Sequence, residues 1–301
     1  MKDIQSYGNF SKVEIINKGW SYDEKYYIET FDGEKLLLRI SDISLYDTKI
    51  KEFEMLKEIS KLDIPMNQPL KCGICNGGKS VFLLFKWLDG VDLEENIHKY
   101  SEEEQYRLGY DAGLILKKIH SVEISSDLNW EEYFNRKMDG KIHNYVQCPI
   151  KYDGDKYILN YIEENRHLLK DRPITFLHGD YHIGNMLVNG KDELGIIDFN
   201  RCSYGDPWEE FNRIVWCASA SPYFASGRIN GYFDMNPPEE FFRLLALYIC
   251  SNTLSSLPWA MSVDKKQIPT MLAQANEILI WFDNMKNPIP NWYIEKNKKD
   301  L

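Results

Sequence analysis

Short stretches in which apolar and polar residues alternate predict a small antiparallel β-sheet in the first third of the chain. The strand-like stretches are residues 12–20, 25–31, 35–41, 69–74 and 80–88. Asp32-Gly33, between the second and third stretches, predicts a hairpin turn. Residues 47–62 differ, because Ile50, Phe53, Leu56 and Ile59 recur there at intervals of three. That spacing predicts one helix with a single apolar face.

From Ser101 onward the pattern is mainly helical. Ser101 stands three residues before Glu104, which predicts a capping box at a helix N-terminus. The apolar face of this helix is expected to hold Leu108, Ala112, Ile115 and Ile119. Further helical stretches lie near 130–146, 155–169 and 207–285. The order predicts an α+β fold with two lobes, at residues 1–86 and 87–301.

Charge and hydropathy narrow the classes of partner. The 301 residues include 36 Lys and Arg against 46 Asp and Glu, a formal net charge of −10. Phosphate binding needs a basic face, so we expect no nucleic-acid partner. No apolar run matches a membrane-spanning helix or a signal-peptide core, so we expect a cytoplasmic protein with no membrane partner. Acidic charge suits a cationic substrate, although it also simply favours solubility.

Residues 176–200, FLHGDYHIGNMLVNGKDELGIIDFN, interrupt the helical pattern with strand-like segments that carry polar residues. His178, Asp180 and Asn185 follow the spacing H-x-D-x-x-x-x-N, and Asp198 ends a later strand. In phosphoryl transfer a carboxylate accepts the proton of the attacking hydroxyl, while an amide oxygen and a second carboxylate hold Mg²⁺. The alternative is a hairpin whose polar groups only satisfy the backbone. The combination favours phosphoryl transfer.

The same stretch resembles the signature of the aminoglycoside phosphotransferase and choline kinase superfamily, small-molecule relatives of the protein kinases. The resemblance rests on HGDYHIGNMLV and GIIDFN, and the order of the lobes extends it over nearly the whole chain. It implies a bilobal protein-kinase-like fold, with a small N-terminal β-lobe carrying one helix and a larger, mainly helical C-terminal lobe. By this resemblance Asp180 is the catalytic base, and Asn185 and Asp198 are the ligands of Mg²⁺.

The resemblance also implies a nucleotide site in the N-terminal lobe. The residues expected to bind ATP or GTP are Gly19, Ser21, Arg39, Glu52, Phe85, Trp87 and Leu88. Arg39 stands in the third strand, where many members carry a lysine for the α- and β-phosphates. Glu52 on the following helix is its expected carboxylate partner, with Glu54 as the competitor, because residues two apart on a helix point to different faces. Trp87 has core packing as its alternative role.

The implied function is transfer of a γ-phosphate to a hydroxyl of a small, cationic acceptor, in a monomer or homodimer. The antibiotic-resistance kinases that act on aminoglycosides look nearest. The alternatives are a choline, ethanolamine or amino-sugar kinase, and a catalytically silent cation-binding protein. Residues 201–240 are where the family builds its acceptor pocket, and they are rich in aromatic side chains. Their carboxylates are expected to face the acceptor or to form a solvated surface: Asp206, Glu209, Glu210, Asp234, Glu239 and Glu240. Asp206 is also expected to cap a helix that begins at Pro207.

Overall fold

The computed structural model describes residues 1–17, 23–122, 124 and 126–296, and it divides the chain into two compact units. The first unit holds residues 1–92 and 185–200, and the second holds 93–184 and 201–301. The N-terminal unit therefore continues past the expected boundary at residue 86, to Asp92. It also includes the strand pair that follows Asn185, which the sequence assigned to the C-terminal lobe.

A five-stranded antiparallel sheet forms most of the first unit, in the order β1-β2-β3-β5-β4. Its strands are β1 Phe10–Ile16, β2 Glu24–Thr30, β3 Lys35–Asp42, β4 Pro69–Cys75 and β5 Ser80–Lys86. The predicted hairpin joins β2 to β3, and Gly33 in its turn has a φ of +81°. Apolar side chains such as Ile28, Leu38 and Phe82 pack together as a core of this unit.

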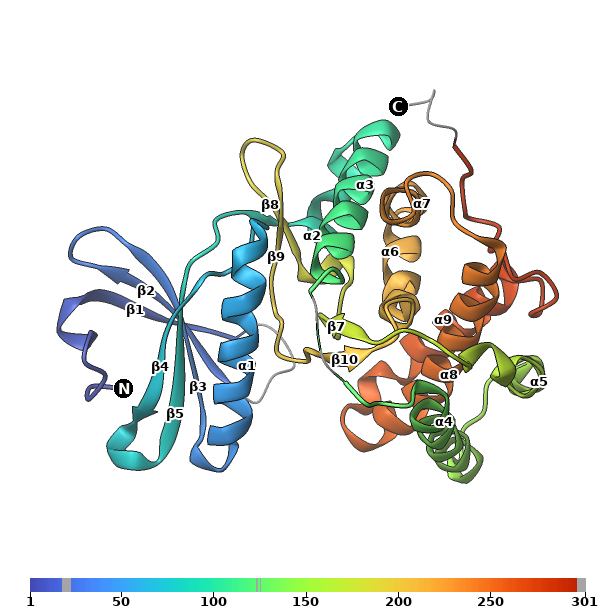
Figure 1. Cartoon of the computed structure of the whole chain (residues 1–301), viewed down its shortest axis with the longest axis horizontal. Coiled ribbons are helices and arrows are strands. Elements are labelled where there is room, and N and C mark those ends of the chain that lie inside the picture. The colour runs from blue at the N-terminus through green and yellow to red at the C-terminus, as the bar shows by residue number, and fades with distance from the viewer. Residues whose placement is uncertain (18–22, 123, 125, 297–301) are drawn as a thin grey trace. The chain divides into compact units, whose positions relative to one another are not determined.

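One helix and a second, smaller sheet complete the first unit. Helix α1, Tyr46–Ile59, packs against β4 and β5 and buries Phe53, Leu56 and Ile59, as its apolar spacing predicted (Figure 1). The smaller sheet has the order β6-β8-β9, with β6 Val91–Asp92, β8 Met186–Val188 and β9 Leu194–Ile196. The amide of Ile196 donates to the carbonyl of Pro65 at 2.8 Å, which ties this sheet to the segment after α1.

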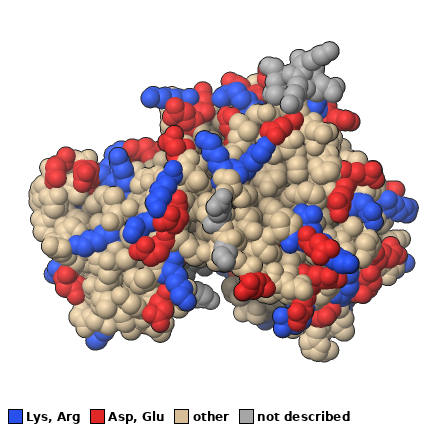
Figure 2. All heavy atoms as spheres, in the orientation of Figure 1, with Lys and Arg blue, Asp and Glu red and all other residues tan. Residues whose placement is uncertain are grey.

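The second unit is mainly helical. Its α-helices are α2 Leu93–Asn96, α3 Glu102–Ile119, α4 Trp130–Gln147, α5 Asp155–Asn165, α6 Ile214–Ala220, α7 Pro222–Tyr232, α8 Glu239–Ser262 and α9 Ile268–Trp281 (Figure 1). Strands β7 Thr175–Leu177 and β10 Ser203–Gly205 pair antiparallel. Across the described residues, no helix has the length and apolar character needed to cross a membrane. Lys and Arg alternate with Asp and Glu over the face shown in Figure 2.

Helix α3 shows where the local predictions succeed and where one is wrong. The capping box is present, because Ser101 Oγ accepts from the Glu104 amide and the Glu104 carboxylate accepts from the Ser101 amide at 2.8 Å. Leu108, Ala112 and Ile119 are fully buried as expected, but Ile115 is only half-buried and Leu116 takes its place. A step of four from Ala112 follows the 3.6-residue turn better than the predicted step of three.

Candidate active site

Asn185 and Asp198 lie at the open end of the β8–β9 hairpin, as the sequence predicted. Asn185 ends the short 3₁₀ turn Ile183–Asn185 directly before β8, and Asp198 comes two residues after β9. The Asn185 carbonyl accepts from the amide of Ile197 at 3.0 Å, which continues the strand pairing to the level of Asp198. Asp198 has a φ of +65°, a region that Asp tolerates better than most residues. Such backbone outliers gather at functional sites.

A lysine that the sequence did not single out lies beside Asp198. Lys25 Nζ is 3.4 Å from Asp198 Oδ2, and 26% of the Asp198 side chain remains exposed. Lys25 pairs directly with Arg39 in the register of β2 and β3, so the two cationic side chains leave the same face of the sheet. The side chains of Asp198 and Asn185 carry oxygen donors of the kind that a hard divalent ion such as Mg²⁺ prefers, so the residue types fit the predicted metal.

Arg39 lies in a buried network with two carboxylates. Arg39 Nη1 donates to Glu52 Oε1 at 2.8 Å, while Nε donates to Asp23 Oδ2 at 3.0 Å and Nη2 donates to the same oxygen. Lys49 Nζ contacts Asp23 Oδ2 at 2.8 Å and Glu52 Oε2 at 3.0 Å. Burial alone would raise the pKa of Asp23, but Arg39 and Lys49 hold that pKa well below its usual range.

Of the two carboxylates proposed as partners of Arg39, Glu52 is the one that binds it. Glu52 is 6% exposed and meets Arg39, whereas Glu54 lies on the exposed side of α1 and pairs with Lys57. Asp23 and Lys49 were missed by the sequence reasoning. Lys49 could have been noticed, since it precedes Glu52 by three residues and therefore shares its helix face.

The residues expected to bind the purine lie at the end of β5. Phe85 is buried with its ring 6.5 Å from that of Phe53. Trp87 packs edge-on against Tyr27 with ring centroids 4.8 Å apart, and its amide donates to the Lys35 carbonyl at 2.9 Å. The sheet thus already uses the Trp87 N–H, and the ring is half-buried against Tyr27. The predicted turn residues Gly19 and Ser21 lie outside the described residues.

Asp180 belongs to the second unit, in the loop after β7, where basic side chains surround it. Arg213 Nε lies 3.3 Å from Asp180 Oδ1, and Arg201 Nη1 lies 3.6 Å from Oδ2. His182 Nε2 is 3.7 Å from Asp180 Oδ1. The sequence pattern did not indicate that either arginine lies beside the predicted base.

His182 is neutral at physiological pH. Burial lowers its pKa to about 4, against the opposite effect of Asp180. Its Nδ1 accepts from the Gly184 amide at 3.1 Å, so the single ring proton belongs on Nε2, the nitrogen nearer Asp180. The imidazole therefore presents an N–H toward this carboxylate without carrying charge.

A buried carboxylate holds the Asp180 loop in shape. Glu210 accepts from the amide of Gly179 at 3.0 Å and from that of Tyr181 at 3.4 Å. Burial would raise the pKa of Glu210, but His120, His178 and the Gly179 amide hold it at about 2. Gly179 has a φ of +85°, and a Cβ built there would lie 2.0 Å from the Arg201 carbonyl oxygen. Only glycine meets both conditions.

His178 is a structural anchor within this loop. Its ring is fully buried, and Nδ1 accepts from the Asp180 amide at 3.3 Å. Arg228, also fully buried, donates to the carbonyls of Tyr181 at 2.7 Å and Glu210 at 3.2 Å. The backbone on both sides of Asp180 is thus fixed by buried groups.

The acidic wall expected from residues 201–240 is only partly present. Glu210 is engaged as described, and Asp206 is fully buried, where Arg172 Nε donates to it at 2.7 Å and the Tyr248 hydroxyl at 2.6 Å. Glu209 lies 3.6 Å from Lys137 Nζ. No helix begins at Pro207, so that prediction is wrong. Asp206 instead accepts from the Trp208 amide at 2.9 Å in a turn before the 3₁₀ helix Glu209–Arg213.

The two units give the chain the α+β fold of the protein-kinase-like small-molecule kinases, which confirms the predicted fold class. A model of the phosphotransferase enzyme family matches residues 12–243, most of the chain. The chain therefore belongs to the phosphotransferase enzyme family. It is an enzyme, a nucleotide-dependent kinase that acts on a hydroxyl group, and the alternative of a catalytically silent binding protein is set aside.

Relatives place the chain within this family at low identity. An aminoglycoside 3'-phosphotransferase of Niallia circulans is 24% identical over 211 residues, which cover 66% of this chain and 76% of the relative. A thermostable mutant of the aminoglycoside phosphotransferase APH(4)-Ia has a TM-score of 0.66 at 14% identity, covering 92% of this chain and 96% of that one. The amicoumacin kinase hAmiN has a TM-score of 0.63 at 15% identity, with 92% and 90% covered. These structures show a shared fold.

Proposed function

We propose that the enzyme transfers the γ-phosphoryl group of ATP or GTP, bound with Mg²⁺, to a hydroxyl of a small molecule. The observation that carries this proposal is the open end of the β8–β9 hairpin. The Asn185 backbone is paired with Ile197 at that end, and the side chains of Asn185 and Asp198 are proposed to supply two oxygen donors of the kind that Mg²⁺ prefers. A family fold together with this donor set favours a working phosphotransferase.

The first unit is proposed to hold the nucleotide. Asn185 and Asp198 would ligate Mg²⁺, which neutralises phosphate charge when bound. Arg39, kept in place by Glu52, is proposed to lie near the α- and β-phosphates. Phe85, Trp87 and Leu88 are proposed to lie near the purine, with Gly19 and Ser21 near the phosphates. We keep residues 1–86 and 87–301 as the proposed nucleotide-binding and acceptor-binding lobes.

Asp180 is proposed as the base. The acceptor oxygen forms a bond to the γ-phosphorus while the bond from that phosphorus to the β,γ-bridging oxygen breaks. The nucleoside diphosphate leaves with that bond's electron pair, and the hydroxyl proton passes to Asp180. The Arg213 guanidinium lies 3.3 Å from this carboxylate and is a cationic neighbour of the proposed base.

The acceptor predicted from sequence is a cationic molecule such as an aminoglycoside, and the Niallia circulans relative is named for that activity. The contacts within the second unit give less support to a cationic acceptor. Asp206 and Glu210 bind Arg172 and backbone amides, so they are not free to meet a cation. Arg201 and Arg213 are the charged side chains nearest Asp180. The acceptor class is therefore argued separately below.

A γ-phosphate-transfer screen tests the proposed function. The purified enzyme is incubated with γ-labelled ATP or GTP, with Mg²⁺ or with chelator, and with one small alcohol at a time. The panel includes an aminoglycoside, a macrolide, choline, an amino sugar and a hydroxy acid. We expect Mg²⁺-dependent label on at least one acceptor and Mg²⁺-dependent thermal stabilisation by nucleotide. Absence of both nucleotide stabilisation and label on any acceptor would refute the proposal.

A further inference from the structure

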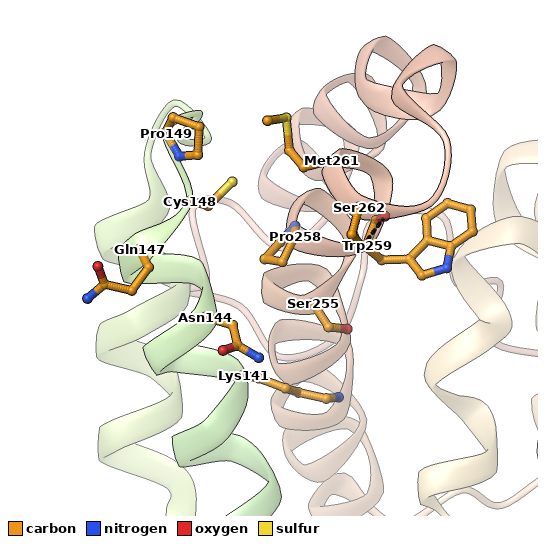
Figure 3. A pocket seen from close by; sticks show the side chains of 10 residues that line it. All are labelled: Lys141, Asn144, Gln147, Cys148, Pro149, Ser255, Pro258, Trp259, Met261 and Ser262. Carbon is orange, nitrogen blue, oxygen red and sulfur yellow. Dashed lines mark hydrogen bonds between the residues drawn. The ribbon is translucent and has the colours of Figure 1, made fainter.

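Lys141, which has no carboxylate partner among the described residues, lines a cavity in the second unit. The cavity has a volume of about 510 Å³ and lies between α4 and α8 (Figure 3). Its walls are Lys141, Asn144, Gln147, Cys148, Pro149, Ser255, Pro258, Trp259, Met261 and Ser262. The side chain of Lys141 runs from α4 toward α8, where its ammonium contacts Ser251 Oγ at 3.3 Å.

The surroundings of Lys141 are unfavourable for an uncompensated cation. Within residues 1–17, 23–122, 124 and 126–296, no carboxylate lies within ion-pairing distance of its ammonium. Burial, together with the charges of Lys137 and Arg213, lowers the pKa of Lys141 to about 7, against the opposite effect of Glu209. The Ser251 hydroxyl and the Phe134 ring, 6.0 Å from the ammonium, carry no negative charge, so an anion that enters the same site would supply the counter-charge that they do not.

Positive charge is present both at the cavity and at the loop of the proposed base, Asp180. Arg213 interacts electrostatically with Lys141 on one side and lies 3.3 Å from Asp180 on the other. Arg201 lies 3.6 Å from the second oxygen of Asp180. Glu209 is the carboxylate that opposes these cations, and its Oε1 already lies 3.6 Å from Lys137 Nζ. Lys141 at the cavity and Arg201 and Arg213 beside Asp180 thus all carry positive charge.

We propose that this cavity binds an anionic group of the acceptor, a carboxylate or a phosphate, with Lys141 as its counter-ion. Arg213 adds positive charge beside Asp180, where the acceptor hydroxyl would be phosphorylated. The inference rests on the proposed function and names its substrate class, a small hydroxyl compound that carries an acid group. It contrasts with the cationic acceptor predicted from net charge, because an ammonium here would meet Lys141 and Arg213 rather than free carboxylates.

Chemical labelling of Lys141 tests binding without relying on activity. A lysine with a pKa of about 7 is largely deprotonated at about pH 8, and the neutral amine reacts with acetic anhydride. An anion bound beside Lys141 raises that pKa and covers the amine, so labelling falls. The probes are glycerate, glycerol 3-phosphate and inorganic phosphate at millimolar concentration, with glycerol as the neutral match and kanamycin as the polycation.

We expect at least one acid probe to slow acetylation of Lys141 by about fivefold or more, while labelling of the exposed Lys156 on α5 stays constant. The glycerate and glycerol 3-phosphate arms show which acid group the cavity prefers. Protection by kanamycin alone, or equal labelling of Lys141 with every probe, would overturn the proposal. A failure of the kinase screen with protection intact would count against the proposed function and not against the anion site.

A variant pair tests the role in turnover. We expect Lys141→Met to raise the KM for an acid-bearing acceptor about tenfold or more. The KM for the nucleotide and the rate of phosphorylation of glycerol, the neutral match, should stay the same. Lys156→Met is the matched control on another helix of the same unit, and we expect it to behave as the parent. A fall in kcat for all acceptors with unchanged KM values would indicate a merely structural Lys141. An aminoglycoside as best acceptor, used equally well by Lys141→Met, would also contradict the inference.

Discussion

Lys25 Nζ lies 3.4 Å from Asp198 Oδ2, so the carboxylate proposed to hold Mg²⁺ has a lysine from β2 as its cationic neighbour. Arg39, the cross-strand partner of Lys25, binds Asp23 and Glu52. Its guanidinium thus already serves two carboxylates. Lys25 has only Asp198 as an ion-pair partner among the described residues, and this carboxylate is proposed to turn to the metal.

Lys25→Met is expected to weaken nucleotide use, because Lys25 would be released to the phosphates when Mg²⁺ occupies Asp198. Loss of a hydrogen bond to a charged group costs roughly 1.5–3 kcal/mol, which corresponds to a rise in nucleotide KM of about 10- to 100-fold. Steady-state kinetics at varied ATP measures the change. Lys35→Met is the control, since Lys35 is an exposed lysine on β3 that pairs with Asp89. Equal KM values in both variants would remove Lys25 from this role.

Asp198→Ala is expected to abolish both activity and Mg²⁺-dependent nucleotide binding, because the metal loses its charged ligand. Calorimetry with Mg·ATP and with ATP in chelator separates the two effects. Since Asp198 has a φ of +65°, Asp198→Asn is the better-tolerated second variant, and it also lacks the negative charge. Glu193→Ala, in the exposed turn of the same hairpin, should bind like the parent. Unchanged Mg·ATP affinity in the Asn variant would exclude Asp198 as a ligand.

Asp180→Asn preserves shape but cannot accept the hydroxyl proton. Turnover is expected to fall on the order of a hundredfold or more, since general-base catalysis contributes about that much. Mg·nucleotide binding should persist, because Asp180 belongs to the other unit from Asn185 and Asp198. Rapid-mix measurement of the phosphorylated acceptor, with calorimetry of Mg·ATP as the control, checks both parts. Near-normal turnover would rule out Asp180 as the base.

Glu52→Gln is expected to destabilise the enzyme, because it leaves Arg39 and Lys49 buried with one carboxylate instead of two. Breaking a buried ion pair from one side costs on the order of 3 kcal/mol. Urea unfolding measures the free energy. Glu54→Gln on the same helix is the matched control, and its exposed contact with Lys57 should contribute almost nothing. Comparable destabilisation by the two variants would argue against the buried network as the cause.

The sequence predicted the features that depend on the periodicity of apolar residues and on the spacing of residues within a motif. Alternation defined the five strands of the first sheet, and the motif placed Asn185 and Asp198 at one end of a hairpin. Contacts between distant segments were not predictable in this way. Lys25 meets Asp198 across 173 positions, and no local pattern marks such a pair.

Charge counting failed for a related reason. Asp206 and Glu210 contribute to an acidic total in the sequence, but both are buried against partners from other segments. Close helix packing was also missed. Gly109 on α3 and Gly227 on α7 let the backbones approach, since a Cβ on either would lie about 2 Å from a carbonyl oxygen of the other helix, at 2.1 Å and 2.2 Å.

Glu210→Gln is expected to destabilise the Asp180 loop, so both turnover and the free energy of unfolding should fall. Both amides donate to Oε1 of Glu210, an oxygen that a glutamine keeps, so the loss comes from removing the negative charge that faces His120 and His178 and from replacing Oε2, which also accepts from the Gly179 amide, by an NH₂ group. The free energy of unfolding should fall by on the order of 1–3 kcal/mol at neutral pH. The pKa of Glu210 lies below its ordinary value of 4.5, at about 2, so its carboxylate stabilises the fold fully above pH 4.5. That contribution disappears as the pH falls toward 2. The free-energy gap between parent and variant, from urea unfolding, should therefore narrow between pH 7 and pH values below 4.5, and a constant gap would contradict the assignment.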